Sequence, residues 1–499
     1  LVAQVDTVFW FAAPNVSAGA GDTPIGLIIV GQEVSSDVTI DMPANGGFVA
    51  INITVAPNTS QVVDLTPFIG QVESAAPNAV NTNGIRIVAT NPITASYSLN
   101  APTNKEIFFL KGNEGLGTDF YTPFQENFDI AAVAPAGKST IEVVATEDNT
   151  TVLITPRTDV VGHAANGTFS IALNIGETYT AQDVNTSAAS SLSGSIVSSN
   201  KNIAVTVSED AIEQGACTST IGDQIVSTEY LGRKYVIQKS TAASDYFVVM
   251  ATQNSTALTL TNSGTSKFVL NWGETRAFTS VDQLNYIECD KPVYVWHVSG
   301  NGCEASAAQV PPMICSGDSK MSYHRPSASP MSLLLYTFAG FEGNFTLNGG
   351  ATVITPGAFQ PIPGTGGQYV AASIPIPLGD VPANSYFEVE NSVAAFGMGV
   401  LGQETGGGSY YGYPTIHKSL TFARLGNDTT ICANTDLDLI GLVGGGAVTG
   451  VWSTNGYGTF TNANTSLINN YVPNAVDTVV SPIRLILKST GDCPVASDT

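Results

Sequence analysis

The 499-residue sequence contains four histidines, His163, His297, His324 and His417, and none of them stands in a zinc-protease, serine-hydrolase or nucleotide-binding motif. His297 follows Trp296 in an apolar run, which predicts a core imidazole with its hydrogen bonds satisfied. His324 could lie beside a ligand, although no carboxylate partner stands near it in the sequence. A glycosidase needs two nearby carboxylates, but among 41 acidic residues such a pair arises by chance. We therefore predict no catalytic residue.

Six cysteines form an even set without a C-x-x-C pair, which predicts disulfides rather than a metal or redox site. Cys432 and Cys493 lie near the two ends of the last candidate domain, and we expect them to pair. The other four allow three connectivities, and free buried thiols are the alternative for all six. These four are Cys217, Cys289, Cys303 and Cys315.

No metal site or cofactor is predicted. Calcium is the one ion that acidic loops such as Asp436–Asp438 would suit, although they lack the EF-hand spacing. A Gly- and Tyr-rich segment contains Tyr410, Tyr411 and Tyr413. Tyrosine buries a large area at a low entropy cost, so this segment is a candidate binding loop. The alternative, which we favour, is a linker to the next domain.

Composition and charge limit the class of protein. Only 12% of the residues are charged, and Thr, Ser, Asn and Gly take their place, which favours β-structure and turns over long helices. The net charge of −23 disfavours nucleic acid and anionic lipid as partners. No apolar run is long enough to span a bilayer. The first residues, Leu1–Gln4, read like a mature start after signal-peptide removal, so we expect an extracellular protein that is one portion of a longer polypeptide.

One pattern recurs four times along the chain. A β-branched run, a short polar turn and an alternating run follow one another, and these features predict a hairpin in each copy. A second block, two strands joined by a turn with Asn or Asp, follows each copy. The first pattern occupies 25–41, 139–155, 245–261 and, more faintly, 333–348; the second occupies 85–97, 195–207, 285–296 and 386–396.

The repeats divide most of the chain into four β-modules, 1–113, 114–228, 229–326 and 327–422. About 100 residues with many short strands is the size of one β-sandwich. We therefore predict an all-β fold of tandem antiparallel β-sandwich modules. The alternative is a β-propeller-like arrangement, in which each module supplies two blades of about 40–50 residues. Residues 423–499 contain Trp452 on a candidate central strand and predict a C-terminal immunoglobulin-like domain.

Several motifs resemble a known family. Phe9–Pro14, Lys111–Tyr121 and the pair Gly300–Cys303 with Pro311–Cys315 resemble the IgGFc-binding-type N-terminal domain, over roughly residues 1–422. This resemblance implies an extracellular binding or adhesion domain and no catalytic residues. The family name by itself does not predict antibody binding.

The tail motifs Val451–Gly456 and Tyr471–Pro473 resemble the repeats of gliding-motility-associated surface adhesins that type IX secretion exports. Thr7, Thr429 and Thr478 stand in triplets that resemble the O-glycosylation acceptor of gliding bacteria, so the chain is a candidate glycoprotein.

We expect a non-enzymatic adhesion or binding protein of the bacterial cell surface, the head of a long repetitive adhesin or fibre. Its expected partner is an extracellular glycan or glycoprotein, or a copy of itself. The alternatives are a self-assembling filament subunit and a polysaccharide-active enzyme.

Overall fold

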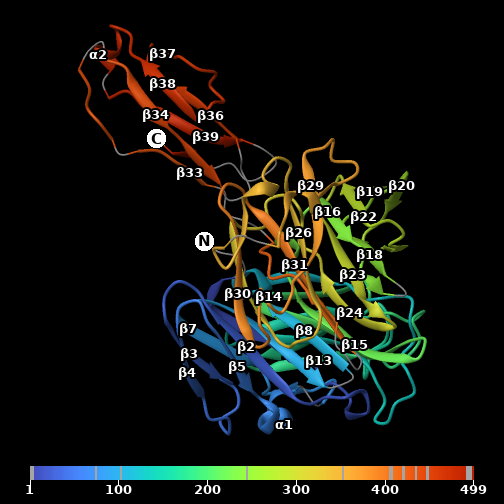
Figure 1. Ribbon diagram of the computed structural model, residues 1–499. Helices are drawn as coiled ribbons and strands as arrows, with labels where there is room; N and C mark the ends of the chain where they lie inside the picture. The colour runs from blue at the N-terminus through green and yellow to red at the C-terminus, as the bar shows by residue number, and fades with distance from the viewer. Residues whose placement is uncertain are drawn as a thin grey trace.

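The computed structural model describes the chain except for residues 1–4, 74–75, 102–103, 243–244, 351–352, 404–407, 418–421, 427, 433–434, 445–448, 481, 491–496 and 499. Among the described residues, strands predominate, and the two α-helices, α1 (Ile69–Val72) and α2 (Asp477–Val480), have four residues each. Four units of strands pack into a body, and a smaller tail, from Phe422 onward, projects from it (Figure 1). The predicted all-β fold of antiparallel sandwich modules is confirmed.

The strands of unit 1 are β1 (Asp6–Phe11), β2 (Ile25–Gly31), β3 (Ser36–Asp41), β4 (Ile51–Val55), β5 (Ser60–Asp64), β7 (Ile85–Ala101) and β8 (Asn104–Leu110). Those of unit 2 are β9 (Leu116–Thr122), β10 (Ser139–Ala145), β11 (Thr150–Thr155), β12 (Phe169–Leu173), β13 (Thr178–Gln182), β14 (Ser195–Gln214) and β15 (Cys217–Ile225), and the short β6 (Val80–Asn81) joins their sheet. In each unit one long strand crosses both layers of the sandwich. The first half of β7 pairs with β1 and β3 and its second half with β2 and β8, and β14 is paired in the same way.

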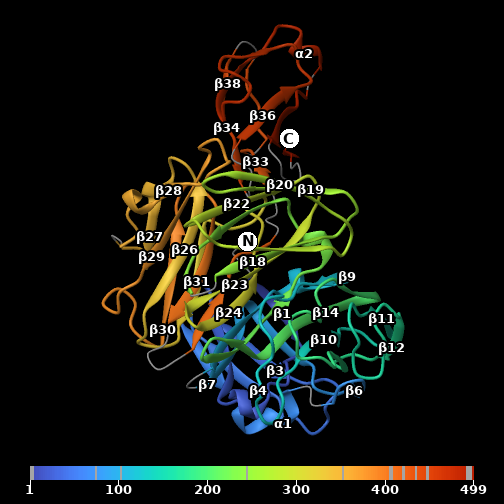
Figure 2. The same ribbon diagram turned by 90° about the vertical axis from the view of Figure 1, so that its right-hand side faces the viewer.

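Units 3 and 4 repeat this plan with the long strand divided in two. The strands of unit 3 are β16 (Lys234–Gln238), β17 (Thr241–Ala242), β18 (Tyr246–Ala251), β19 (Thr256–Thr261), β20 (Thr265–Leu270), β21 (Thr275–Thr279), β22 (Leu284–Cys289), β23 (Val293–Gly302) and β24 (Glu304–Gln309). Those of unit 4 are β25 (Lys320–Arg325), β26 (Met331–Phe338), β27 (Phe345–Leu347), β28 (Gln360–Pro361), β29 (Tyr369–Pro375), β30 (Ser385–Asn391), β31 (Phe396–Gln403) and β32 (Ser409–Gly412). β22 and β23 lie in different sheets, as do β30 and β31. Units 3 and 4 lie side by side above units 1 and 2 (Figure 2). The exact module boundaries stay a prediction.

The hairpins predicted within each repeat are wrong. β10 and β11 do not pair with each other; they pair with different halves of β14, and β18 and β19 lie in different sheets. The reason is burial: β10 is buried at every position, whereas β11 alternates between buried and exposed positions. A strand that is covered on both faces belongs to an inner layer. A strand whose positions alternate between buried and exposed belongs to a layer with one solvent-exposed face. The turn between them, with Asn149 at φ 55° and the equivalent Ser255 at φ 54°, therefore crosses from one layer to the other.

The last strands of the four units form a closed ring at the centre of the body. β8 packs on β15, β15 on β24, β24 on β32, and β32 on β8. Asn104 Nδ2 donates to Thr220 Oγ1 at 2.7 Å, Ser219 Oγ to Glu304 Oε2 at 3.3 Å, and Ser409 Oγ to the Glu304 carbonyl at 3.4 Å. The units are thus arranged around one axis, as in a propeller, while each unit keeps the two layers of a sandwich.

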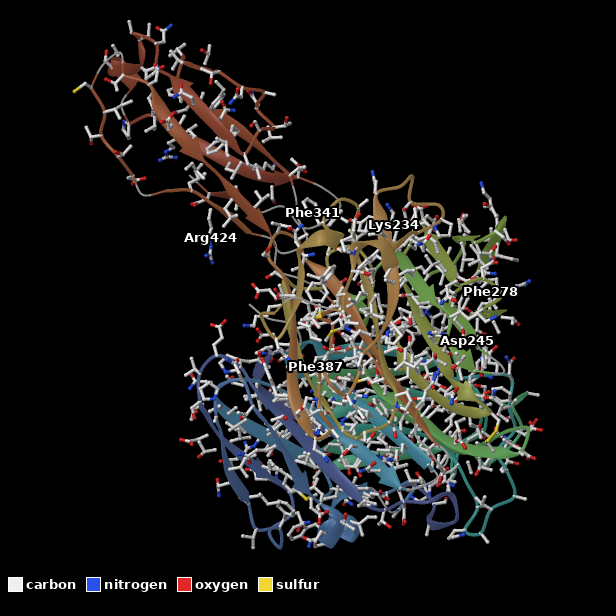
Figure 3. All side chains as sticks on the ribbon, in the orientation of Figure 1. Lys234, Asp245, Phe278, Phe341, Phe387 and Arg424 are labelled. Carbon is white, nitrogen blue, oxygen red and sulfur yellow. A yellow bond between two sulfur atoms is a disulfide. The ribbon has the colours of Figure 1, made fainter. Side chains whose placement is uncertain are left out.

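The interior of the body is continuous across the units. One hydrophobic core runs from unit 1 through unit 2 to Tyr246 and Trp296 of unit 3. Asp245 and Phe387 lie within the body and Arg424 lies on the tail (Figure 3). No helix among the described residues is long and apolar enough to cross a membrane.

The tail is a small immunoglobulin-like sandwich. Its strands are β33 (Phe422–Arg424), β34 (Leu437–Ile440), β35 (Leu442–Gly444), β36 (Thr449–Thr454), β37 (Thr459–Phe460), β38 (Ile468–Val472), β39 (Leu485–Thr490) and β40 (Ser497–Asp498). Trp452 is buried against Tyr471 and Leu487 in the tail core, and its Nε1 donates to the Ser466 carbonyl at 2.9 Å. Trp452 is therefore a core residue, as the sequence predicts.

Candidate functional site

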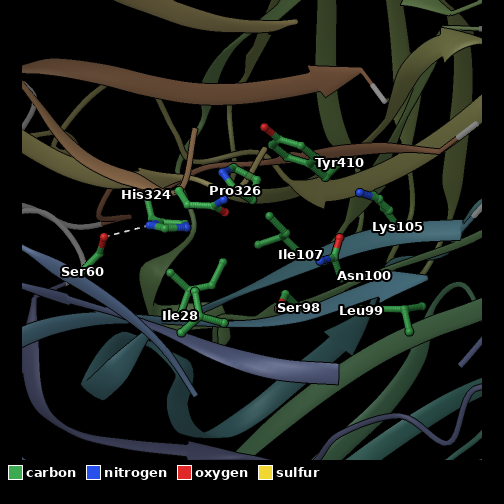
Figure 4. A pocket seen from close by; sticks show the side chains of 12 residues that line it. Ile28, Ser60, Ser98, Leu99, Asn100, Lys105, Ile107, His324, Pro326 and Tyr410 are labelled. Carbon is green, nitrogen blue, oxygen red and sulfur yellow. Dashed lines mark hydrogen bonds between the residues drawn. The ribbon is translucent and has the colours of Figure 1, made fainter. Parts of the chain in front are cut away.

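A cavity of about 390 Å³ lies between units 1 and 4, beside the place where β8 and β32 meet in the ring. Its apolar wall includes Ile28, Val62, Leu99, Ile107 and Pro326. Its polar side chains include Ser60, Ser98, Asn100, Lys105, His324 and Tyr410 (Figure 4). None of the described residues that line it is an aspartate or a glutamate.

β25 brings His324 to this cavity. It is an edge strand that, among the described strands, pairs with β30 alone, and its side chains alternate between two faces. Met321 and Tyr323 enter the core of unit 4, and the alternate residues face unit 1. The contacts with unit 1 are Lys320–Glu33 (3.4 Å), Ser322–Gln32 (3.0 Å) and His324–Ser60 (2.8 Å). The Lys-x-Ser-x-His alternation is the sequence signal for this face.

The His324 ring is held at one nitrogen and open at the other. Nδ1 lies 2.8 Å from Ser60 Oγ, whereas Nε2 is buried and has no hydrogen-bond partner in the structure. The side chain is 3% exposed, and burial lowers the pKa of His324 to about 4, so the ring is neutral at pH 7. An unpaired buried polar atom costs free energy, so a ligand that hydrogen-bonds to Nε2 removes that cost.

Tyr410 is placed by a glycine on the neighbouring strand. Gly402 of β31 faces Tyr410 of β32 across the ladder. A Cβ at position 402 would overlap the Tyr410 ring, so only glycine lets the ring lie against the strand. Lys105 and Asn100 face each other across the β7–β8 ladder at the unit 1 side of the cavity. His324 and Lys105 stand at opposite sides of the cavity (Figure 4).

A second cavity, of about 430 Å³, has a different chemistry. Its lining carries charges of both signs, including the Lys234–Glu288 ion pair (3.6 Å). His417 also lines it, is 1% exposed and has no partner at either ring nitrogen in the structure; burial, followed by the charge of Lys111, lowers its pKa well below the usual value. The described lining of the first cavity, by contrast, contains no carboxylate.

The tyrosine segment is neither the exposed binding loop nor the linker that the sequence left open. Tyr411 and Tyr413 are buried, and Tyr411 donates to Tyr413 at 2.5 Å. They are interior because β32 belongs to the central ring. Tyr410 is also buried, but its ring lines the cavity. Sequence reasoning missed Lys105, Asn100 and Ser60, which come from a different module than His324.

His297 is a satisfied core histidine, as predicted. Its side chain is fully buried, with Nδ1 2.8 Å from the Tyr411 hydroxyl and Nε2 2.9 Å from Asp245. Burial alone would raise the pKa of Asp245, but the charge and hydrogen bond of His297 and the hydrogen bonds of Ser240 hold it below the usual value. This acid–imidazole–phenol chain lies inside unit 3 and the ring, so it orders the core.

The cysteines pair differently from the prediction. Cys217 and Cys303 form a disulfide with a Cα–Cα distance of 5.5 Å, which joins the β14–β15 and β23–β24 turns. Cys315 is also disulfide-bonded. Cys289 is buried and free, and Cys432 is exposed and free. Because Cys432 is free, the predicted Cys432–Cys493 bond is wrong; Cys493 itself lies outside the described residues.

The candidate glycosylation sites differ in accessibility. Thr429 and Thr478 are exposed on the tail, whereas Thr7 is partly buried in β1. Glycosylation at all three stays a prediction. Among the described residues, no group of three or more His, Cys, Asp or Glu side chains could hold a metal ion, and calcium binding likewise stays a prediction.

Glu73 gives the stability of the body a dependence on pH. It is 5% exposed; Oε2 accepts from the Val16 amide at 3.1 Å, and Oε1 has no partner in the structure. Burial and the charge of Asp22 raise its pKa to about 9. The folded state therefore holds a proton that the unfolded state releases, and stability falls as the pH rises from about 4.5 toward 9.

Glu73→Gln is expected to remove this loss, because the amide keeps the Val16 hydrogen bond and cannot ionise. The free energy of unfolding at pH 7 should rise by about 1–3 kcal/mol, and the gain should disappear at pH 4. Thermal unfolding across this pH range measures it, with the exposed Glu213→Gln as the control. An equal gain at every pH would contradict the assignment to ionisation.

The comparison with protein families gives a match that lies within the four-unit body and does not extend to the tail. The family model of the IgGFc binding protein matches residues 107–402, which is more than half of the chain. The match begins within β8, includes units 2 and 3 and ends in β31 of unit 4. A comparison with curated proteins finds no match. The chain belongs to the IgGFc-binding protein family.

Proposed function

We propose that this chain is a non-enzymatic extracellular adhesion protein, the head of a long repetitive adhesin or fibre on a bacterial cell surface. Membership of a binding-protein family supports the binding role. The Cys217–Cys303 disulfide is typical of proteins that fold in an oxidising compartment outside the cytoplasm. The surface location, in a bacterium with gliding motility, rests on the resemblance of the tail to adhesin repeats.

We place the ligand site of this proposal in the cavity between units 1 and 4 and take the ligand to be a glycan or glycoprotein. The observation that carries it is His324, a neutral buried imidazole with Nε2 unpaired at a cavity of about 390 Å³. Hydroxyl, amide and imidazole groups stand beside aliphatic walls, and a sugar presents both kinds of surface. A glycosidase needs two carboxylates about 5–10 Å apart, and the described lining offers none. The cavity therefore favours binding over hydrolysis.

His324→Ala is expected to weaken glycan binding, because it removes the unpaired nitrogen and enlarges the cavity. A glycan array probed with the wild-type chain identifies bound glycans, and the variant should lose at least about 10-fold in affinity, the value of one hydrogen bond. His163→Ala, which removes a histidine that does not line the cavity, is the control. Equal binding by wild type and folded His324→Ala would move the site elsewhere.

A second candidate function is self-assembly into a filament. Ile440 of β34 and Ile468 of β38 are cross-strand neighbours on the tail, and they are 74% and 68% exposed. An exposed apolar pair of this kind favours contact with a copy of the chain or with the next repeat. Electron microscopy of the purified chain tests it: regular filaments support self-assembly, and isolated particles support the adhesin head alone.

A further inference from the structure

We infer that β21 of unit 3 is a docking edge, to which an extended peptide segment of a partner protein adds as a further antiparallel strand. This surface is separate from the cavity between units 1 and 4.

The backbone of β21 has hydrogen-bonding groups to spare. β21 lies at the edge of its sheet, next to β18. The Glu274 carbonyl accepts and the Ser280 amide donates toward β18. The alternate residues Thr275, Ala277 and Thr279 therefore turn their amides and carbonyls to the other side. No described residue forms a hydrogen bond with these outward groups, and Ala277 and Thr279 are exposed. A sheet edge of this kind readily accepts another strand.

The equivalent edge in unit 2 carries such a strand. β13 occupies the place of β21, because the Gly176 and Gly273 amides each donate to the last residue of the neighbouring inner strand. The short β6 of unit 1 pairs with β13 in an antiparallel manner. The Gly84 amide donates to the Gly176 carbonyl at 3.2 Å, and the Asn78 amide donates to the Thr180 carbonyl at 3.0 Å. In unit 4, β28 pairs with β29 in the same antiparallel way. The repeat thus indicates an added antiparallel strand as the cover that β21 lacks.

The lengths of two connecting segments explain why β21 is left uncovered. β6 belongs to the segment 65–84 between β5 and β7, whereas the corresponding segment of unit 2, 183–194, is shorter. This shorter segment folds back on its own unit, where the Thr186 carbonyl accepts from the Ile130 amide at 2.7 Å. In unit 2 the Val161 amide, in the loop between β11 and β12, also donates to the carbonyl at the end of β13. In unit 3 that loop is reduced to the short turn between β19 and β20. Neither cover of β13 has a counterpart at β21 among the described residues.

The side chains beside the edge indicate which peptide fits. The Arg276 guanidinium lies 4.4 Å from the ring centre of Phe268 and forms no ion pair with a described residue. Phe278 lies on the same face of β21 as Arg276, at the side of unit 3 away from unit 4 (Figure 3). On the added strand, the position opposite Arg276 is a non-hydrogen-bonded one, where side chains of two strands are closest. An acidic residue at that position, with an apolar residue opposite Phe278, therefore fits.

The probe is a fluorescein-labelled, C-terminally amidated peptide of the sequence Ser-Val-Thr-Glu-Thr-Val-Ser, titrated with the intact wild-type chain by fluorescence anisotropy. N-methylation of both threonines removes amides that would face β21 and is expected to weaken binding at least about 10-fold. Ala277→Pro should have the same effect, because it removes an outward amide, and proline is tolerated on an edge strand at such a position. Ala277→Ser keeps the amide, is the matched control and should bind like wild type. Circular dichroism and melting temperature establish that the variants are folded.

Arg276→Gln tests the acidic preference separately. Wild type should bind the glutamate peptide about 2- to 5-fold more tightly than a peptide with lysine in its place, the value of a cross-strand charge pair. Arg276→Gln should remove this preference and keep the effect of N-methylation. Equal affinity of wild type for the two peptides overturns the acidic part of the inference.

The remaining outcomes decide the docking edge itself. Equal binding of the plain and N-methylated peptides, full binding by folded Ala277→Pro, or no binding of the glutamate peptide at about 1 mM overturns strand addition at β21. A wild-type chain that dimerises, with an Ala277→Pro variant that stays monomeric in sedimentation, assigns the edge to a second copy and overturns the partner protein. Ala277 does not line the cavity between units 1 and 4, so Ala277→Pro should keep glycan binding, and either proposal can fail while the other holds.

Discussion

Lys111→Met is expected to lower the free energy of unfolding by about 3–5 kcal/mol, the loss typical of breaking a buried ion pair from one side. Lys111 Nζ lies 2.8 Å from Asp223 Oδ2, and the two side chains are 1% and 2% exposed. The pair links β15 to the residue that follows β8. Burial raises the pKa of Asp223 in spite of the attraction of Lys111, so the carboxylate depends on this cation to remain ionised.

The neighbours of the pair show why no other group can replace Lys111. Asp223 Oδ2 also accepts from the Gln309 amide at 3.2 Å, but Oδ1 has no partner in the structure. Without the lysine, Asp223 must either take up a proton or keep an uncompensated charge in the core.

Urea unfolding at pH 7 measures the Lys111→Met effect through the shift in midpoint. The double variant Lys111→Met/Asp223→Asn is the matched control and should recover part of the loss, because no buried charge remains. A double variant as unstable as the sum of the two single variants would show that the pair is not coupled. A Lys111→Met loss below about 1 kcal/mol would place the pair among weak surface-like pairs.

Removal of the Cys217–Cys303 disulfide is expected to cost about 4 kcal/mol, because the bond closes a long loop and so restricts the unfolded chain. The two cysteines are 86 residues apart in the sequence. They lie at the turns before β15 and β24, which are neighbours in the ring. The bond therefore joins units 2 and 3 at the start of β15. The Lys111–Asp223 pair joins units 1 and 2 near the other end of that strand.

The double variant Cys217→Ser/Cys303→Ser should show this loss in urea unfolding, measured against wild type without reductant. Cys432→Ser is the control, because Cys432 is exposed and free; its effect should stay within about 0.5 kcal/mol. Addition of a reductant to wild type should cost at least as much, because it also breaks the disulfide of Cys315. A stable double variant would mean that the packing of the ring strands alone holds units 2 and 3 together.

Local patterns in the sequence determined the strands and their repetition. Low charge, β-branched runs and period-2 alternation predicted an all-β chain, because strand burial depends on which side chains alternate. The apolar run around His297 was enough to predict a core imidazole, and the place of Trp452 on a candidate central strand of an immunoglobulin-like domain was enough to predict a core tryptophan. The motifs near Lys111 and Cys303 were enough to predict the family that the match over residues 107–402 confirms.

Which strands pair was decided by the tertiary structure. The buried run at β10 and the alternating run at β11 are close in sequence and were predicted to pair, but their different burial sends them to different halves of β14. Local sequence shows which positions of a strand are buried, but it does not show which other strand packs against them. The same reason applies to Tyr411 and Tyr413. Their polar hydroxyl groups and the glycines around them predicted a surface segment, but both side chains lie in the interior.

The candidate site depends wholly on the closure of the ring. His324 and Ser60 are separated by 264 residues, and Lys105 reaches the same cavity from a third segment. No spacing in the sequence relates these residues, because their distance depends on the packing of β32 against β8. The sequence alone determined a repetitive, disulfide-bearing β-protein of a binding family. Only the tertiary structure decided where that protein offers a cavity, since the cavity exists between its first and last units and within neither.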